Sequence, residues 1–250
     1  MRFATKAGLV ICITCCLWSH VQAQDSLNIT KVHQESYLGI LGNFEIQDTV
    51  AYILGYGFRK VSFSDNHAPQ ELYSYSSDYY FTALLLDDTI AYVGTRGLMV
   101  FDMSDPNSPQ LLTHIGGDSW SWDRVEDMYL DGHNLFVLYE SWIYVYDVTD
   151  PANPVEVYYS VWHNNGVAVY GRGFYAYVAA GANLYVYNIR GGFSPVETLA
   201  LPSSVRGMDI RGDILYTANY WPSGITAISI ANPTHPSIVI NNLEYPLATN

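Results

Sequence analysis

Tryptophans with polar neighbours are the residues of this sequence best suited to bind a ligand. Indole faces beside hydrogen-bonding groups are surfaces on which a sugar ring or a partner's side chain stacks. The candidate binding residues are Trp120, Trp122, Trp142, Trp162, Trp221, Asp118, Asp123, Arg124, His163, Asn164, Asn165 and Arg206. The alternative is that the rings are structural, covering strand edges or closing the top of a central channel.

Catalysis is a rival use of the same residues. Asp118 and Asp123 flank two tryptophans, and paired acids of this kind hydrolyse glycosidic bonds in many enzymes. Residues of this kind are, however, more often ordinary loop aspartates. The histidines show no paired metal-ligand spacing, and no His–Glu–x–x–His or Gly–x–Ser–x–Gly motif is present. We therefore expect no catalytic residues, no metal and no cofactor. A carbohydrate- or lactone-active enzyme that uses Asp, His and Arg side chains remains the alternative.

Two short motifs imitate binding sites. Gly171–Ala176 reads GRGFYA, which matches the dinucleotide fingerprint, but the pattern around it predicts no following helix to hold a pyrophosphate. Arg211–Asp213 spells a cell-attachment tripeptide at a predicted turn. Both are better explained as turn chemistry.

A repeat of about 40 residues organises the chain and must position these groups. Ile143–Val155 reads IYVYDVTDPANPV, and Met99–Gln110 reads MVFDMSDPNSPQ. Weaker copies end at Pro69, Pro195 and Pro236, so that the last prolines of the five copies lie 40, 45, 41 and 41 residues apart. Short strands at this period predict an all-β propeller with one four-stranded blade per repeat. The expected units are 37–80, 81–124, 125–166, 167–204 and 205–240.

Each unit divides into four strands, as residues 125–130, 135–138, 143–148 and 155–160 of the third unit show. A tight Asp131–Gly132 turn joins the first two strands, and an Asp–Pro–x–x–Pro segment joins the last two. Proline has no N–H to donate and so ends the strand ladder, while the Asp side chain can accept the amides that the turn leaves open. The candidate binding residues then fall on one face, which carries the second-to-third-strand turns and the links between blades.

This element resembles the LVIVD repeat of exported bacterial and archaeal propellers. The resemblance is close in the second and third units and weaker in the fourth and fifth, where Asn188 and Ser229 replace the Asp that ends the third strand. It extends over all five units, roughly residues 37–240. The resemblance implies a propeller and an exported protein, and it implies no established catalytic residue.

The N-terminus has the features of a secretory signal peptide. Arg2 and Lys6 precede an apolar stretch over 8–18, and a small-residue cleavage site ends at Ala23. Removing residues 1–23 takes away all three cysteines and changes the formal net charge from −13 to −15. Such a charge opposes binding to nucleic acid or anionic lipid. We expect a propeller over residues 24–250 that is secreted, periplasmic or at the cell surface, without membrane insertion.

The predicted function is a non-catalytic exported scaffold that presents its aromatic loop face to a glycan or an extracellular protein. A structural spacer within a larger surface protein is a further alternative. Ring closure is the last open question. A closed five-blade ring would use Lys31–Tyr37 as an outer strand and leave Ser237–Asn241 surplus; otherwise the chain is part of a larger propeller or closes by an irregular seam.

Overall fold

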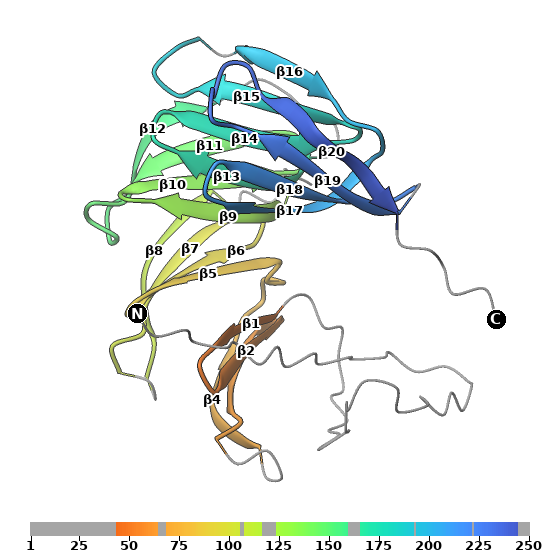
Figure 1. Ribbon diagram of the computed structural model, residues 1–250. Coiled ribbons are helices and arrows are strands. Elements are labelled where there is room, and N and C mark those ends of the chain that lie inside the picture. Colours follow the sequence, from red (N-terminus) through yellow and green to blue (C-terminus); the bar gives the residue numbers. More distant parts are fainter. Residues whose placement is uncertain are drawn as a thin grey trace, which may run out of the picture.

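The computed structural model describes residues 44–64, 69–105, 108–116, 124–159, 166–192, 194–221 and 223–244. In these residues the chain forms five antiparallel sheets of four strands each (Figure 1). The all-β architecture and the five four-stranded blades predicted from the repeat are confirmed. No helix in the described part of the chain is long and apolar enough to cross a membrane.

Each blade takes its strands from one continuous stretch of chain. The first contains β1 (Phe44–Gln47), β2 (Val50–Gly55), β3 (Gly57–Ser62) and β4 (Gln70–Ser76). The second contains β5 (Ala83–Asp87), β6 (Ile90–Gly94), β7 (Gly97–Asp102) and β8 (Gln110–Gly116). The third contains β9 (Val125–Asp131), β10 (Asn134–Tyr139), β11 (Ile143–Asp147) and β12 (Val155–Tyr159). The fourth contains β13 (Gly166–Arg172), β14 (Tyr175–Ala180), β15 (Asn183–Asn188) and β16 (Glu197–Ala200). The fifth contains β17 (Val205–Arg211), β18 (Ile214–Asn219), β19 (Gly224–Ser229) and β20 (Ser237–Glu244).

The turn between the first and second strands has the same shape in every blade. Its first residue has a positive φ in all five: Asp48, Asp88, Gly132, Gly173 and Gly212. Glycine and aspartate are among the residues that tolerate this backbone region most readily. Hairpin turns therefore explain Gly173 and Gly212 in the two motifs, Gly171–Ala176 and Arg211–Asp213, that resemble binding sites.

The turn between the third and fourth strands is held by a side chain at the end of the third strand. Asp147 Oδ1 accepts the N–H of Thr149 at 2.9 Å and its hydroxyl at 2.6 Å. Asp102 accepts the N–H of Ser104 at 2.8 Å, and these bonds keep the pKa of both carboxyl groups below their ordinary range. Asn188 keeps the function in the fourth blade by accepting the N–H of Arg190 at 3.0 Å.

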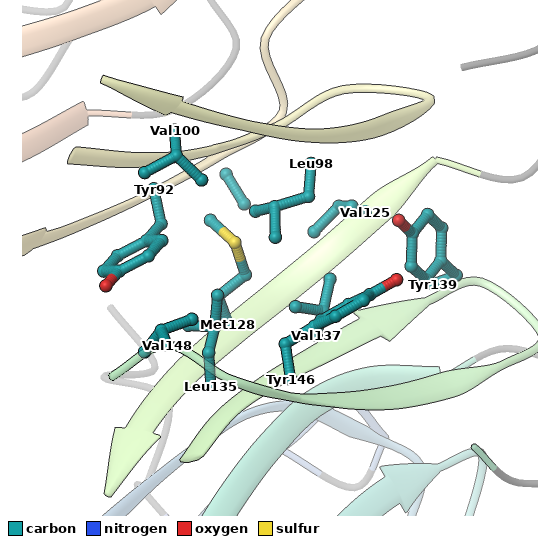
Figure 2. Close-up of a cluster of buried hydrophobic side chains, with 11 residues drawn as sticks. Tyr92, Leu98, Val100, Val125, Met128, Leu135, Val137, Tyr139, Tyr146 and Val148 are labelled. Atoms are coloured by element: carbon teal, nitrogen blue, oxygen red, sulfur yellow. The ribbon is translucent and has the colours of Figure 1, made fainter. Parts of the chain in front are cut away.

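Blades pack in chain order through their inner strands. The first strand of each blade lies against the first strand of the next, through β1, β5, β9, β13 and β17. We call the side of a blade that faces the next blade its outgoing face, and the opposite side its incoming face. Figure 2 shows one such junction, where Tyr92, Leu98 and Val100 of the second blade meet residues of the third, including Leu135 and Val137. Three similar clusters fill the other junctions.

Backbone hydrogen bonds reinforce these junctions on the face that carries the predicted site. The N–H at or just before the start of each first strand donates to a carbonyl at the second-to-third-strand turn of the preceding blade. The pairs are Phe81 to Gly55 at 2.7 Å, Val125 to Thr95 at 2.8 Å, Gly166 to Glu140 at 3.0 Å and Val205 to Gly181 at 2.9 Å. This face is therefore a rigid platform for the loops that join its strands.

The first and fifth blades are the two ends of a curved row (Figure 1). Among the described residues no sheet combines strands from both of them. Ser237–Asn241, expected to be surplus in a closed ring, belongs to β20, the fourth strand of the fifth blade. That strand continues to Glu244, beyond the expected end at residue 240, and pairs with β19 through two register shifts. The expected outer strand Lys31–Tyr37 lies outside the described residues.

Candidate functional site

The predicted site divides into residues that the structure describes and residues that it does not. Arg124, Trp142, Arg206 and Trp221 are described. The others lie outside the described residues: Asp118, Trp120, Trp122, Asp123, Trp162, His163, Asn164 and Asn165. The paired acids on which the glycosidase interpretation depends thus lie outside the described residues, and the candidate site that the structure describes is on the fifth blade.

Trp221 lies in the loop between β18 and β19, and this loop is fixed to the segment that precedes β17. The Ser203 hydroxyl donates to the Trp221 carbonyl at 2.6 Å and accepts the Trp221 N–H at 3.0 Å. The Tyr220 N–H donates to the Ser204 carbonyl at 2.8 Å. Because Ser203 is itself buried, the two segments are joined by a protected pair of hydrogen bonds. The backbone that carries the two rings is therefore held in place.

Arg206, Tyr220 and Trp221 form what we call the Arg206 patch. The Arg206 guanidinium carbon lies 4.2 Å from the centre of the Tyr220 ring, which is a cation–π contact worth about 0.5–1 kcal/mol at an exposed site. Tyr220 is 60% exposed and Trp221 is 78% exposed. Two large rings and a cation are thus displayed to solvent on a fixed loop.

The third blade places its two predicted residues differently. Trp142 is partly buried and packs against the hydrophobic cluster between the second and third blades. Arg124 Nε donates to Glu126 Oε1 at 2.7 Å, and this hydrogen bond together with the charge of Glu126 raises the pKa of Arg124. Trp142 therefore serves packing, and neither residue joins the Arg206 patch.

Further aromatic residues on this face had not been proposed from the sequence. Tyr56, between β2 and β3, makes an edge contact with Tyr80 at 5.4 Å between ring centres. Tyr79 makes an edge contact with His114 at 5.1 Å. Tyrosines are so numerous in this chain that the sequence alone does not single out Tyr56, Tyr79 and Tyr80.

The opposite face also carries an exposed ring under a cation. The Arg190 guanidinium carbon lies 3.3 Å from the centre of the Phe174 ring, and Phe174 is 43% exposed. These residues come from the two turns of the fourth blade that share this face. Phe174 and Arg190 thus provide a natural comparison for Tyr220 and Arg206.

Among the described carboxyl groups, that of Asp127 has the most strongly shifted pKa, and Asp127 lies in a junction between blades. Burial raises its pKa to about 6 against the effect of two backbone hydrogen bonds. Its Oδ1 accepts the N–H of Met128 at 2.9 Å, and its Oδ2 accepts the N–H of Val169, in the fourth blade, at 2.8 Å. Since each oxygen already accepts a backbone amide, this arrangement is that of a structural tie.

Gly171 has a packing role that replaces the imitation dinucleotide motif. A Cβ at this position would lie 2.0 Å from Cε2 of Phe136, a fully buried ring of the third blade. Glycine, which has no side chain, therefore leaves the room that the Phe136 ring of the third blade occupies. Within the described ranges, no group of three or more His, Cys, Asp or Glu residues could hold a metal ion.

Solved structures share the fold at low sequence identity. The computationally designed Ika8 protein matches at 14% identity with a TM-score of 0.61, over 77% of this chain and 59% of its own. A chain of the Mitotic Checkpoint Complex matches at 14% identity with a TM-score of 0.59, over 84% of this chain and 73% of its own. The designed Ika4 protein matches at 16% identity with a TM-score of 0.50, over 64% of this chain and 98% of its own. At these identities the likeness concerns the fold alone, and this chain spans less than two thirds of the Ika8 chain.

Comparison of the sequence with known proteins and families gives one match, over a short part of the chain. No curated protein matches the sequence. A family model described as the LVIVD repeat matches residues 89–115. The match begins one residue before β6 and includes β6, β7 with Asp102 at its end, and most of β8. The chain therefore carries an LVIVD repeat in the second blade of a fold made of five four-stranded blades.

Proposed function

We propose that this protein is an exported, non-catalytic binding scaffold that uses the Arg206 patch to bind a glycan. The observation that supports it best is the exposure of Trp221 and Tyr220 on a loop fixed by Ser203. A ring that is already held loses little conformational freedom when a ligand stacks on it. An unbound surface that keeps two large rings in water in this way is typical of a recognition site.

The chemistry of the patch favours a sugar as the ligand. The exposed indole offers an apolar face for the C–H groups of a pyranose ring. The guanidinium of Arg206 supplies hydrogen-bond donors beside that face, and it has no acceptor capacity of its own. A neutral or acidic glycan therefore fits the patch better than a cationic one. Separately, the acidic net charge of the chain disfavours polyanionic partners such as nucleic acid.

The exposed rings of Tyr220 and Trp221 disfavour the alternative function of a structural spacer. A spacer would be expected to bury its tryptophans, and Trp221 is 78% exposed. A protein partner is also compatible with a Trp–Tyr–Arg patch, because these residue types dominate protein interfaces. We commit to a glycan because the indole face and the Arg206 donors together match the C–H and hydroxyl groups of a sugar ring.

A glycan-array screen of the purified protein, with a matched pair of variants, tests the proposal. Trp221→Ala removes the exposed indole, whereas Phe174→Ala removes an exposed ring beside a guanidinium on the opposite face. We expect the wild type and Phe174→Ala to bind the same glycans, and Trp221→Ala to bind them at least about tenfold more weakly, which corresponds to the loss of one stacked ring. Equal binding by both variants, or no binding by the wild type, would contradict the proposal.

Export is tested separately. The proposed signal peptide predicts that the secreted protein begins at Gln24, and N-terminal sequencing of material from the culture medium or periplasm checks this. A cell-associated product that still starts at Met1 would contradict export without affecting the binding test.

A further inference from the structure

The outgoing face of the fifth blade carries exposed apolar side chains on its second and fourth strands, with the exposed Asp209 of β17 beside them. The third residue of each second strand points at the following blade, where it is almost fully buried: Tyr52, Tyr92, Phe136 and Tyr177. The corresponding residue of the fifth blade is Tyr216, and it is 36% exposed. The repeat thus places a large ring where a neighbouring blade covers it in four cases out of five.

The fourth strand of the fifth blade extends this exposed face. Ile240 and Leu243 pair with Ala227 and Ile225 of β19, which places them on the same face as Tyr216. They are 46% and 60% exposed. The residues that correspond to Ile240 in the first four blades, Tyr73, Thr113, Tyr158 and Glu197, are all buried or half-buried. An apolar strand face of this kind is unfavourable in water unless another element covers it.

Charged residues at the rim indicate which element covers it. At the end of β13, Arg172 reaches the turn of the next blade, where its Nη1 lies 2.6 Å from Asp213 Oδ1 and donates to the Gly212 carbonyl at 3.2 Å. Arg211 holds the corresponding position at the end of β17. Among the described blades, the other end of the row is the first blade, whose corresponding turn begins with Asp48. Asp48 takes the position of Gly212, one residue before the place of Asp213, which Thr49 holds in the first blade. It is therefore the carboxylate that this turn offers to Arg211, although not at the position of Asp213.

The incoming face of the first blade supplies a second complementary pair. Where the second, third and fourth blades have Met99, Tyr144 and Tyr185, the first blade has Arg59. Met99 packs in the same cluster as Tyr52. By the same geometry Arg59 would meet Tyr216, and a guanidinium over a tyrosine ring is a favourable contact. Phe44, which is 41% exposed, lies on this incoming face beside Ile53.

We propose that the outgoing face of the fifth blade binds the incoming face of the first blade of a second copy of this chain. The contact is head to tail, so that each copy uses two different surfaces. Such a contact closes into a ring of copies when the rotation permits and otherwise continues as a filament. In either case it buries Tyr216, Ile240 and Leu243 in the way that the four internal junctions bury their counterparts.

The molar mass of the full-length protein, measured over a series of concentrations, tests the proposal. Sedimentation equilibrium should give a multiple of the 28.0 kDa chain mass, or of its processed form, at tens of micromolar protein. Ile240→Glu should weaken association at least about tenfold, because it buries an unpaired carboxylate. Leu111→Glu is the matched control, since Leu111 lies in the fourth strand of the second blade and is 45% exposed.

Charge reversal identifies the partner surface. Arg211→Asp and Asp48→Arg should each weaken association, and the double variant should restore it, because the ion pair re-forms with its charges exchanged. Circular dichroism and thermal melting confirm that each variant is folded. A wild type that stays monomeric, whether its fifth blade is bare or covered by residues of its own chain, would overturn the proposal. Association that Ile240→Glu leaves unchanged, or that the double variant does not restore, would overturn it equally.

Discussion

Asp127 shows how one residue links two repeats. The corresponding positions of the neighbouring blades hold Ala83 and Ala168, so the third blade has a carboxylate where a small apolar side chain is otherwise sufficient. The carboxylate gains the Val169 amide across the junction and loses its hydration. Since burial outweighs the two hydrogen bonds, its pKa rises to about 6.

This shift predicts a pH dependence of stability. An unfolded chain releases the Asp127 proton near pH 4, whereas the folded chain keeps it up to about pH 6. The folded state therefore binds more protons between these values, and its stability falls as the pH rises through that window. The contribution is at most about 3 kcal/mol, since each pKa unit corresponds to about 1.4 kcal/mol.

Asp127→Asn tests this expectation. The amide cannot ionise, so the variant should lose the part of the stability decrease that Asp127 causes between about pH 4 and pH 7. Urea unfolding of both proteins at these two pH values gives the comparison. A variant whose unfolding free energy changes with pH as steeply as that of the wild type would show that Asp127 does not titrate in this range.

Packing between strands of neighbouring blades is the next scale, and Gly171 makes it measurable. Gly171→Ala would place a methyl group 2.0 Å from the Phe136 ring, which is enclosed on all sides. The junction between the third and fourth blades must then open, at a cost of about 1–3 kcal/mol. Gly207→Ala is the control, because a Cβ at this position of β17 meets nothing within 4 Å. It should leave stability unchanged or raise it slightly by restricting the unfolded chain.

Denaturant unfolding of the two glycine variants compares them directly. We expect the midpoint to decrease for Gly171→Ala while the slope stays that of the wild type, and to remain close to the wild-type value for Gly207→Ala. If both variants unfold at the wild-type midpoint, the Phe136 ring moves aside at little cost and the packing role assigned to Gly171 is wrong.

Strands and turns were predictable from the sequence because their determinants are local. The third blade has its strands within a residue or two of the predicted ranges, since alternation and the Asp–Pro–x–x–Pro segment act over a few residues. The length of β20 was not predictable, because its two register shifts depend on pairing with β19. The packing role of Gly171 was not predictable either, because the residue that it contacts, Phe136, lies 35 positions earlier in the sequence.

The candidate site was predictable only in outline. The sequence placed Trp221 and Arg206 on one face, because turns of the same type must share a face of each blade. It could not show that Trp142 packs into a junction or that Ser203 fixes the Trp221 loop, since both contacts form only after blades and loops meet. The special role of Asp127 could have been noticed in the sequence, because this acid aligns with alanines in the two neighbouring repeats.

At the scale of the whole molecule, the row of blades behaves as a one-dimensional array. In the described part of the chain, every extensive contact between blades joins two neighbours in the chain, so stability is approximately a sum of blade terms and junction terms. The three inner blades have two junctions each, whereas the first and fifth have one among the described residues. The end blades should therefore open more readily than the inner ones.

Amide hydrogen exchange should follow this order. We expect the slowest exchange in β10 and β14, where Leu135–Leu138 and Ala176–Ala179 are fully buried on both faces. Exchange should be faster in β18, where Tyr216 and Ala218 are exposed. It should be fastest in β1 and β20, which are edge strands of the sheets of the two end blades. The reason is that opening an inner blade disrupts two hydrophobic junctions, whereas opening an end blade disrupts one.

Protein concentration separates the two causes of protection at the fifth blade. At low concentration the β18 and β20 amides should exchange at the rates of a blade with one junction. If a second copy docks on this blade, the same amides should gain protection as the concentration rises, while β10 and β14 stay unchanged. Exchange that is as slow in β18 as in β10 at every concentration would show that the fifth blade is already covered within one chain. Uniform exchange through all five blades would instead mean that the chain unfolds as one cooperative unit, and that the description as an array of semi-independent blades is wrong.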